Sequence, residues 1–180
     1  MLELHPVTAP GDAQFTCLAM WSRTIALGWS DETAEIHGID IVELGTKQRY
    51  RLDSLTARPQ RLWVDRRERT WIVDSDNRLL LASGKSLPQA WRPADTVFQP
   101  LEANPHPFAV RGEYVLPDGE AVLSMCGDAE SLYLLRQGEI LRYRLAVPQR
   151  GEERFTLDPE LPYATDCRVM PSGRLALWIP

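Results

Sequence analysis

The sequence has little lysine, and it contains no long hydrophobic run. Only Lys47 and Lys85 are lysine, so arginine supplies nearly all of the positive charge. No apolar stretch reaches the roughly 20 residues that a membrane-spanning helix needs. The first residues, Met1–Pro6, lack a basic segment followed by an apolar core, so no secretory signal is expected. These absences predict a protein that neither crosses a membrane nor carries a signal peptide.

Cysteine and histidine are also scarce, and neither occurs with metal-ligand spacing. Cys17, Cys126 and Cys167 are far apart, no C-x-x-C occurs, and the three histidines are isolated. We expect each cysteine to be a small buried residue, reduced as in a cytoplasmic protein. The sequence lacks G-x-S-x-G, a P-loop and G-x-G-x-x-G, which are the usual signals of hydrolases and nucleotide-binding or dinucleotide-binding proteins. We therefore predict no metal, no cofactor and no catalytic residue.

The composition is that of a globular protein of one domain. The 180 residues include 44% hydrophobic and 25% charged residues, which excludes a disordered tail. The formal net charge is −5 at pH 7, which argues against a general nucleic-acid-binding protein.

The segment 61–81 carries the pattern on which the fold prediction depends. Three short apolar runs, Leu62–Val64, Trp71–Val73 and Leu79–Leu81, are separated by polar turns rich in Asp, Asn and Arg. Such runs suit a pleated, buried surface, and the breaks between them are too frequent for a helical period. The segment is predicted to be a β-meander.

The same pattern recurs along the chain. Four antiparallel strands are expected between residues 15 and 52, a second unit starts at residue 61, a third covers 121–157, and a last one, 166–179, stops about halfway. The first turns of these units lie near Ser22, Arg66, Asp128 and Ser172. Their spacings are roughly 44, 62 and 44 residues, and propeller blades recur at about 40 to 45.

The long middle interval contains a proline-rich segment at about 87–117. Proline lacks the N–H donor that a central strand requires, so we expect an excursion over the surface. Within it, Phe108–Val110 and Tyr114–Leu116 are predicted to form a small hairpin around Arg111–Glu113. A loop of this length in a compact domain is usually functional or disordered.

The repeat resembles the blades of bacterial β-propellers of the NHL type. Leu62-Trp63-Val64-Asp65 followed by Thr70-Trp71-Ile72-Val73-Asp74 is similar to their "L-x-V-D, turn, L-W-V-x-D" pattern. Pro171-Ser172-Gly173-Arg174-Leu175-Ala176-Leu177-Trp178 matches the "D-G-R-L-W" hairpin of such blades. The resemblance implies an all-β propeller. The chain also resembles the propeller components of bacterial multi-protein systems that are encoded with MoxR-type ATPases and von Willebrand A domains.

The expected fold is a single propeller over residues 1–180, with about four blade-like units of four antiparallel strands each. The propeller is expected to be incomplete, or to be closed by the N-terminal strand or by a partner. A blade buries its faces only against neighbouring blades. The half-built last unit therefore needs partner strands. The N-terminal segment Leu2–Val7 is one source, and another part of a longer propeller or a second copy of the chain is the alternative.

Several side chains are candidates for contact with a partner protein. In the proline-rich segment they are Trp91, Arg92, Phe98, His106 and Phe108. Arg66 and Arg67 belong to a basic cluster, residues 58–69, that is predicted either to bind a phosphate or an acidic partner surface, or to be an exposed turn balanced by Asp65 and Glu68. Asp74–Asn77 has the oxygen ligands of a Ca²⁺ site, although a hairpin turn explains them better.

We therefore expect a non-catalytic module that binds another protein in a bacterial multi-protein assembly. The first alternative is a propeller enzyme of the lactonase or lyase type with a central metal held by Asp65, Asp128 and Asp166. The second is a structural component of a phage-tail-like particle. We expect the protein to bind neither nucleic acid nor a membrane, and we expect it to form a homo-oligomer.

Overall fold

The fold is built almost entirely from antiparallel β-strands. The computed structural model describes residues 8–45, 48–84, 98–100, 109–160 and 164–180. These residues form four antiparallel sheets and one short 3-10 helix, η2 (Pro148–Arg150). In this part of the chain, no helix has the length and apolar character that crossing a membrane requires.

The first sheet is a meander of four strands, each paired with the next along the chain. Its strands are β1 (Gln14–Trp21), β2 (Thr24–Asp31), β3 (Ile36–Glu43) and β4 (Gln48–Leu55). Trp21 pairs with Thr24, which leaves only Ser22 and Arg23 in the connecting turn. Ser22 has a φ of 53°, as tight hairpin turns of this kind require.

The second sheet has five strands in the order β5-β6-β7-β9-β8. Its strands are β5 (Pro59–Val64), β6 (Thr70–Asp74), β7 (Arg78–Ser83), β8 (Phe98–Pro100) and β9 (Ala109–Val115). The first three are the strands expected from the segment 61–81, and Trp63 pairs directly with Trp71 across β5 and β6.

The third and fourth sheets complete the described part of the chain. The third contains β10 (Ser124–Gly127), β11 (Ser131–Arg136), β12 (Glu139–Arg144) and β13 (Glu152–Thr156). The fourth contains β14 (Asp166–Val169) and β15 (Leu175–Trp178).

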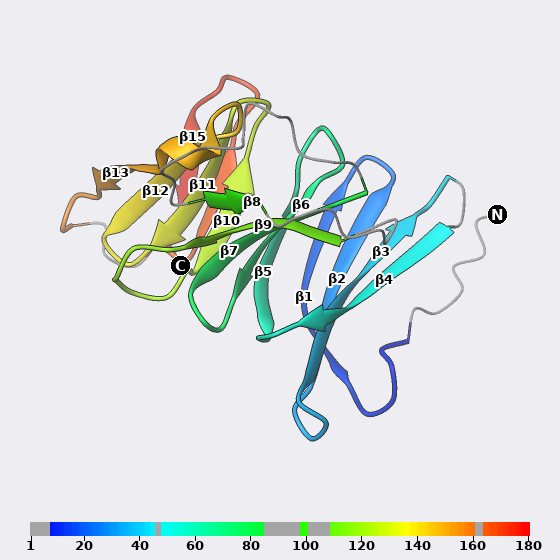
Figure 1. Ribbon diagram of the computed structural model, residues 1–180. Helices are drawn as coiled ribbons and strands as arrows, with labels where there is room; N and C mark the ends of the chain where they lie inside the picture. The colour runs from blue at the N-terminus through cyan, green and yellow to red at the C-terminus, as the bar shows by residue number, and fades with distance from the viewer. Residues whose placement is uncertain (1–7, 46–47, 85–97, 101–108, 161–163) are drawn as a thin grey trace.

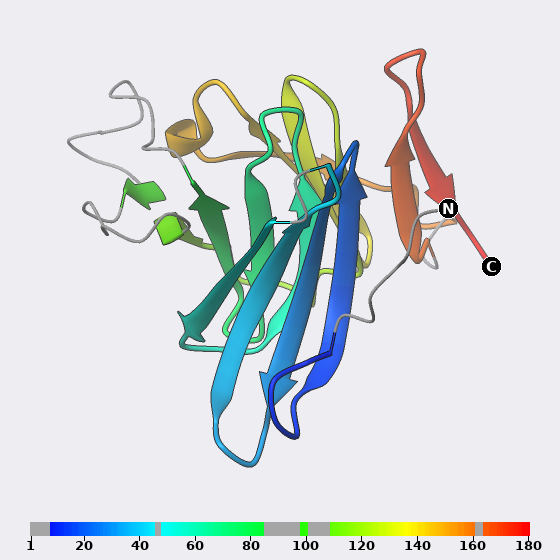
Figure 2. The ribbon, with the colours of Figure 1, turned by 90° about the vertical axis from the view of Figure 1, so that its right-hand side faces the viewer.

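The sheets follow one another in chain order and pack face to face, as Figures 1 and 2 show. Their first strands are neighbours, because β1 contacts β5, β5 contacts β10, and β10 contacts β14. We call these four the inner strands. The all-β prediction with blade-like units is therefore confirmed, with five strands in the second sheet instead of four. The segment Leu2–Val7, which was expected to complete the last unit, lies outside the described residues.

Each pair of adjacent sheets encloses its own hydrophobic cluster. The first cluster joins the first two sheets and includes Ile39, Ile41, Leu62 and Ile72. The second joins sheets two and three, and the third joins sheets three and four. The burial of apolar surface in these clusters holds the sheets together, because each Å² removed from water contributes about 25 cal/mol.

The hairpin expected around Arg111–Glu113 does not form. Residues 109–115, the end of the segment expected to be an insertion, are the continuous strand β9, which pairs with β7 on one edge and β8 on the other. Gly112, at the centre of the expected turn, pairs with Leu81 and Pro100. A strand with partners on both edges satisfies more backbone N–H and C=O groups than an isolated hairpin does.

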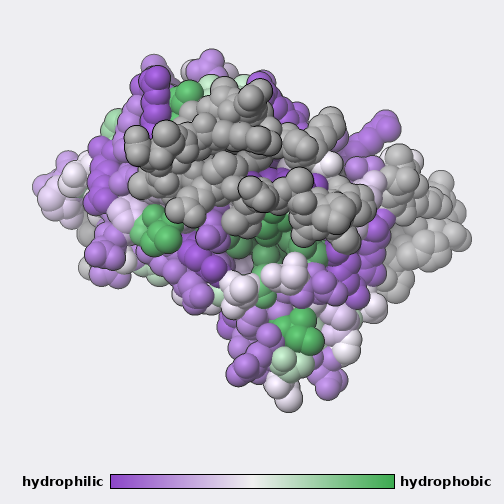
Figure 3. Space-filling model, in the orientation of Figure 1, coloured by the Kyte–Doolittle hydropathy of each residue, from purple (hydrophilic) through white to green (hydrophobic). Residues whose placement is uncertain are grey.

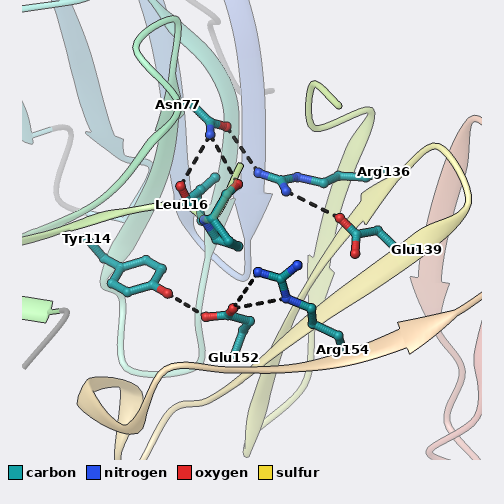
Figure 4. A network of polar contacts seen from close by, with 8 residues as sticks. Asn77, Tyr114, Leu116, Arg136, Glu139, Glu152 and Arg154 are labelled. Atoms are coloured by element: carbon teal, nitrogen blue, oxygen red, sulfur yellow. Dashed lines mark hydrogen bonds and ion pairs between the residues drawn. The ribbon is translucent and has the colours of Figure 1, made fainter. Parts of the chain in front are cut away.

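A polar network supplements the apolar packing between the second and third sheets (Figure 4). Arg136 is fully buried, and its guanidinium donates to the Asn77 side-chain oxygen at 3.2 Å and to Glu139 at 3.3 Å. The Asn77 amide donates to the Leu116 carbonyl oxygen at 3.4 Å. In the same view, the Tyr114 hydroxyl donates to Glu152, whose other oxygen accepts from Arg154 at 3.2 Å.

Candidate functional site

Turns that follow the inner strands of all four sheets gather at one end of the stack. They enclose a hollow of about 490 Å³, which we call the axial hollow. Trp21 comes from the first sheet, and Trp63 and Arg66 come from the second. The third and fourth sheets contribute Gly127–Glu130 and Val169–Pro171 with Gly173. Because each sheet supplies one wall, only the stacking of the sheets creates this space.

A second hollow of about 570 Å³ adjoins the first, and the two share Arg66, Ala129 and Glu130. We call it the arginine groove. It lies between the β5–β6 turn and the end of β12, and its lining is rich in arginine. The lining residues are Asp65, Arg66, Arg67, Arg69, Ala129, Glu130, Ser131, Arg142, Arg144 and Leu145–Val147.

The buried residue Asp65 directly follows β5, and its carboxylate stabilises the β5–β6 turn through hydrogen bonds. One carboxylate oxygen accepts from the backbone N–H groups of Arg67 at 2.8 Å and Arg69 at 3.1 Å. The other accepts from the Arg69 guanidinium at 2.6 Å and the Trp71 indole N–H at 3.1 Å. Glu68 completes the turn with a φ of 61°. Burial lowers the pKa of Arg69, and the charge of Asp65 opposes that shift.

Arg66 and Arg67 extend from the tip of this turn and are exposed. The Arg66 guanidinium lies 5.8 Å from the centre of the Trp21 ring, a cation–π contact that connects the second sheet to the first. Among the described residues, neither arginine forms an ion pair within 4.0 Å. Asp65, which the sequence suggested as a balancing charge for the basic cluster, pairs with Arg69 of that cluster.

The opposite wall of the groove holds two arginines that share one carboxylate. Arg142 lies 3.4 Å and Arg144 lies 2.7 Å from Glu153 of β13. Arg142 also donates to the Ser131 hydroxyl at 2.9 Å. The groove is thus lined by five arginines and by two carboxylates, Asp65 and Glu130, so positive charge predominates in a chain whose formal net charge is −5.

The boundary between the axial hollow and the core depends on one close approach. A Cβ atom at Gly127 would lie 2.5 Å from the Trp63 ring and 2.6 Å from the Ser131 carbonyl oxygen. Glycine is therefore the residue that allows the Trp63 ring, on the inner strand of the second sheet, to rest against the backbone of the third. This contact sets the spacing between two walls of the hollow.

The predicted contact residues fall into two groups. Trp91, Arg92, His106 and Phe108 lie outside the described residues. Phe98 begins the edge strand β8, for which only backbone pairing is described. Arg66 and Arg67 line the arginine groove. Arg69 of the same basic cluster also lines the groove, whereas Arg58 precedes β5 and Arg61 donates to the Leu123 carbonyl oxygen at 2.7 Å.

The acidic residues considered as metal ligands are occupied by local hydrogen bonds. Asp74 accepts from the backbone N–H groups of Asp76 and Arg78, and it pairs with the Arg78 guanidinium at 2.7 Å. Asp128 accepts from two N–H groups of its own turn, and Asp166 accepts from the Ser124 hydroxyl. No group of three or more His, Cys, Asp or Glu residues with metal-binding geometry occurs within the described ranges.

Sequence reasoning missed Trp21 as a residue of the axial hollow, and Arg142 and Arg144 as residues of the arginine groove. Trp21 ends the inner strand β1, directly before the predicted first turn at Ser22, so the repeat itself carried the signal. For Arg142 and Arg144 there was no signal, because the residues of the facing wall, Asp65–Arg69, lie in another sheet and far earlier in the chain.

No protein-family model matches the sequence, and no curated protein is similar to it. Two solved structures resemble the fold. The computationally designed protein Ika4 has a TM-score of 0.53 and 12% identity, over 99% of this chain and 95% of Ika4. YCF48 bound to a D1 peptide has a TM-score of 0.54 and 9% identity, over 97% of this chain. YCF48 is a propeller protein, and this chain spans 49% of its length. These likenesses confirm a propeller-like fold.

Proposed function

We propose that this chain is a non-catalytic propeller module that binds an acidic segment of another protein in the arginine groove. The observation that supports the proposal is the pair Arg66 and Arg67, which are exposed at the groove without an ion-pair partner among the described residues. Guanidinium groups bind carboxylates through paired, charge-assisted hydrogen bonds. A bacterial multi-protein assembly, which the sequence suggested, is the proposed setting.

The shape of the site favours an extended segment over a small molecule. The arginine groove and the axial hollow are continuous through Arg66, Ala129 and Glu130, and together they touch all four sheets. A peptide lying along both would place carboxylates near Arg66 and Arg67 and apolar groups against Trp21, Trp63 and Met170. The similarity in fold to the propeller protein YCF48, which has been solved bound to a D1 peptide, supports a peptide as the ligand.

The test is the binding of a short fluorescent peptide rich in Glu and Asp, compared with the same peptide carrying Gln and Asn. We expect the acidic peptide to bind more tightly than the neutral peptide. Its affinity should fall at high salt, because exposed charges are screened. The double variant Arg66→Gln/Arg67→Gln should weaken acidic-peptide binding about tenfold or more.

The matched control is Arg58→Gln/Arg154→Gln. It removes the same charge at two side chains that are 52% and 50% exposed and that line neither hollow. It should leave peptide binding nearly unchanged. The proposal is wrong if the two peptides bind equally, or if both double variants weaken binding to the same extent, because the latter would indicate general attraction between charges.

A further inference from the structure

Two cysteines that are far apart in the sequence meet between the third and fourth sheets. Cys126 lies in β10 and Cys167 in β14, the inner strands of these sheets, and their Sγ atoms are 3.0 Å apart. Both residues are buried, with exposed fractions of 8% and 2%, and both are free thiols. A disulfide has an S–S length of about 2.05 Å, so the two sulfur atoms need to approach by only about 1 Å to bond.

The immediate surroundings distinguish the two sulfur atoms. The Cys126 thiol donates a hydrogen bond to Cys167, which lowers the pKa of Cys167. The same contact, together with burial, raises the pKa of Cys126. The Ser124 hydroxyl lies 3.7 Å from the Cys167 sulfur. Cys167 is therefore the thiol that forms a thiolate more readily, and the thiolate is the reactive species in disulfide exchange.

We propose that Cys126 and Cys167 form a reversible disulfide that staples the fourth sheet to the third. The oxidant is a low-molecular-weight disulfide. The Cys167 thiolate attacks one of its sulfur atoms, which forms a mixed disulfide and releases one small thiolate. Cys126, after losing its proton, attacks the Cys167 sulfur and releases the second small thiolate. Two electrons pass to the oxidant, and the two released thiolates take up the protons of the two cysteines.

The staple would strengthen the attachment of the fourth sheet, which has two strands. Within the described residues, β14 and β15 pair only with each other, and the third cluster and the hydrogen bond from Ser124 to Asp166 attach them to the third sheet. Their turn nevertheless forms one wall of the axial hollow through Met170, Pro171 and Gly173. Cys126 directly precedes Gly127, which lines the opposite wall. A bond between the two cysteines would thus hold two walls of the hollow together.

Oxidation of the full chain with excess oxidised glutathione, followed by mass spectrometry, tests the inference. We expect a mass loss of about 2 Da, for two hydrogens, and a Cys126–Cys167 link in the peptide map of the unreduced protein. The midpoint of thermal unfolding should rise by roughly 5 °C or more, because the bond closes a loop between residues 41 apart. A reducing agent should reverse both changes.

The third cysteine provides the matched control. Cys17 lies in β1, with its sulfur 3.5 Å from the Pro59 carbonyl oxygen, on the other side of the second sheet. Cys17→Ser should still form the link, whereas Cys126→Ser and Cys167→Ser should not. The peptide map of the unchanged protein decides the matter even if these variants fold poorly. Glutathione adducts alone, a link that includes Cys17, or an unaltered mass under conditions that loosen the fourth sheet would overturn the proposal.

Discussion

At the scale of single residues, two turns of the second sheet use the same arrangement of aspartate and arginine. Asp65 pairs with Arg69, and Asp74 pairs with Arg78, in each case four residues later. In each turn the aspartate also accepts two backbone N–H groups, and the residue before the arginine has a positive φ. The two carboxylates therefore shape these turns, and the turn built by Asp65 presents Arg66 and Arg67 at the groove.

Replacing Asp65 by alanine should destabilise the protein strongly. Asp65 and Arg69 are 1% and 7% exposed, so the substitution leaves a buried guanidinium without its carboxylate. The loss of a buried partner is expected to lower the free energy of unfolding by about 3 kcal/mol. Urea unfolding measures the change. Asp76→Ala, at an aspartate side chain that is 61% exposed, is the control and should lower it by less than about 0.5 kcal/mol. Equal effects would show that the buried pair is unimportant.

At the scale of elements, β9 connects the second sheet to the third. The Tyr114 hydroxyl donates to Glu152 at the start of β13, and the Tyr114 ring packs edge-on against Tyr143 of β12 at 5.4 Å. Burial, followed by the hydrogen bond to Glu152, raises the pKa of Tyr114 to about 12. β9 thus couples the packing of two sheets to the ionisation of one hydroxyl.

This coupling predicts a loss of stability at alkaline pH. Folding raises the pKa of Tyr114 from 10.0 to about 12. The contribution of Tyr114 to the free energy of unfolding is therefore complete below about pH 10 and is lost as the pH approaches about 12. Urea unfolding through this range should show a steeper decline in the free energy of unfolding for the unchanged protein than for Tyr114→Phe. At neutral pH the variant should be less stable by about 1.5 kcal/mol, since it loses a hydrogen bond to a charged group.

Tyr133→Phe is the control for this prediction. The Tyr133 hydroxyl has no hydrogen-bond partner among the described residues, and its ring contacts Arg142 in a way that phenylalanine preserves. It should change stability little at neutral pH. If Tyr114→Phe kept the full alkaline decline, the ionisation of another group would have to cause it.

At the scale of the whole molecule, the two end sheets leave apolar side chains exposed. On β1, Cys17 and Ala19 face the second sheet, so Leu18 and Met20 point away and are 65% and 64% exposed. On β15, Leu177 faces the third sheet, and Trp178 is 68% exposed. By contrast, the coloured part of the face seen in Figure 3 is largely hydrophilic, with separate hydrophobic patches. The outer faces of a stack of blades are the surfaces that a further blade would cover.

We therefore expect the protein to associate through these outer faces, as a homo-oligomer. The molar mass in solution, measured by light scattering over a range of concentrations, should exceed that of the monomer. Leu18→Gln/Met20→Gln should shift it toward the monomer, because polar amides disfavour burial at the contact. Val115→Gln, which alters a residue that is 68% exposed on β9, is the control and should leave the mass unchanged. A monomeric mass for the unchanged protein at all concentrations would contradict the expectation.

Most of the fold could be predicted because its signals are local. The runs Leu62–Val64, Trp71–Val73 and Leu79–Leu81 all lie in strands, and the turns between them contain the residues that tolerate positive φ or accept backbone N–H groups. Strand β9 could not be predicted as a single strand, because Gly112 resembles a turn residue locally. Its pairing with β7 and β8 decides its conformation.

The candidate site was predicted only where it belongs to one turn. Arg66 and Arg67 were identified from the basic cluster, whereas the groove that they line needs Arg142 and Arg144 from another sheet. Likewise, the sequence predicted only that each cysteine is a small buried residue. It did not predict that the Sγ atoms of Cys126 and Cys167 lie 3.0 Å apart. Contacts between residues so far apart in the sequence depend on how the blades stack.

The sequence by itself determined most of the strands, the antiparallel meanders that they form and the turns between them, because alternation of side chains and turn chemistry act over a few residues. Only the tertiary structure decided which turns share a hollow, which arginines pair with a carboxylate, and which cysteines touch. These outcomes depend on the packing of one sheet face against the next, through clusters whose members come from separate units. Burial of apolar surface rewards such packing without regard to distance along the chain, so no local pattern records it.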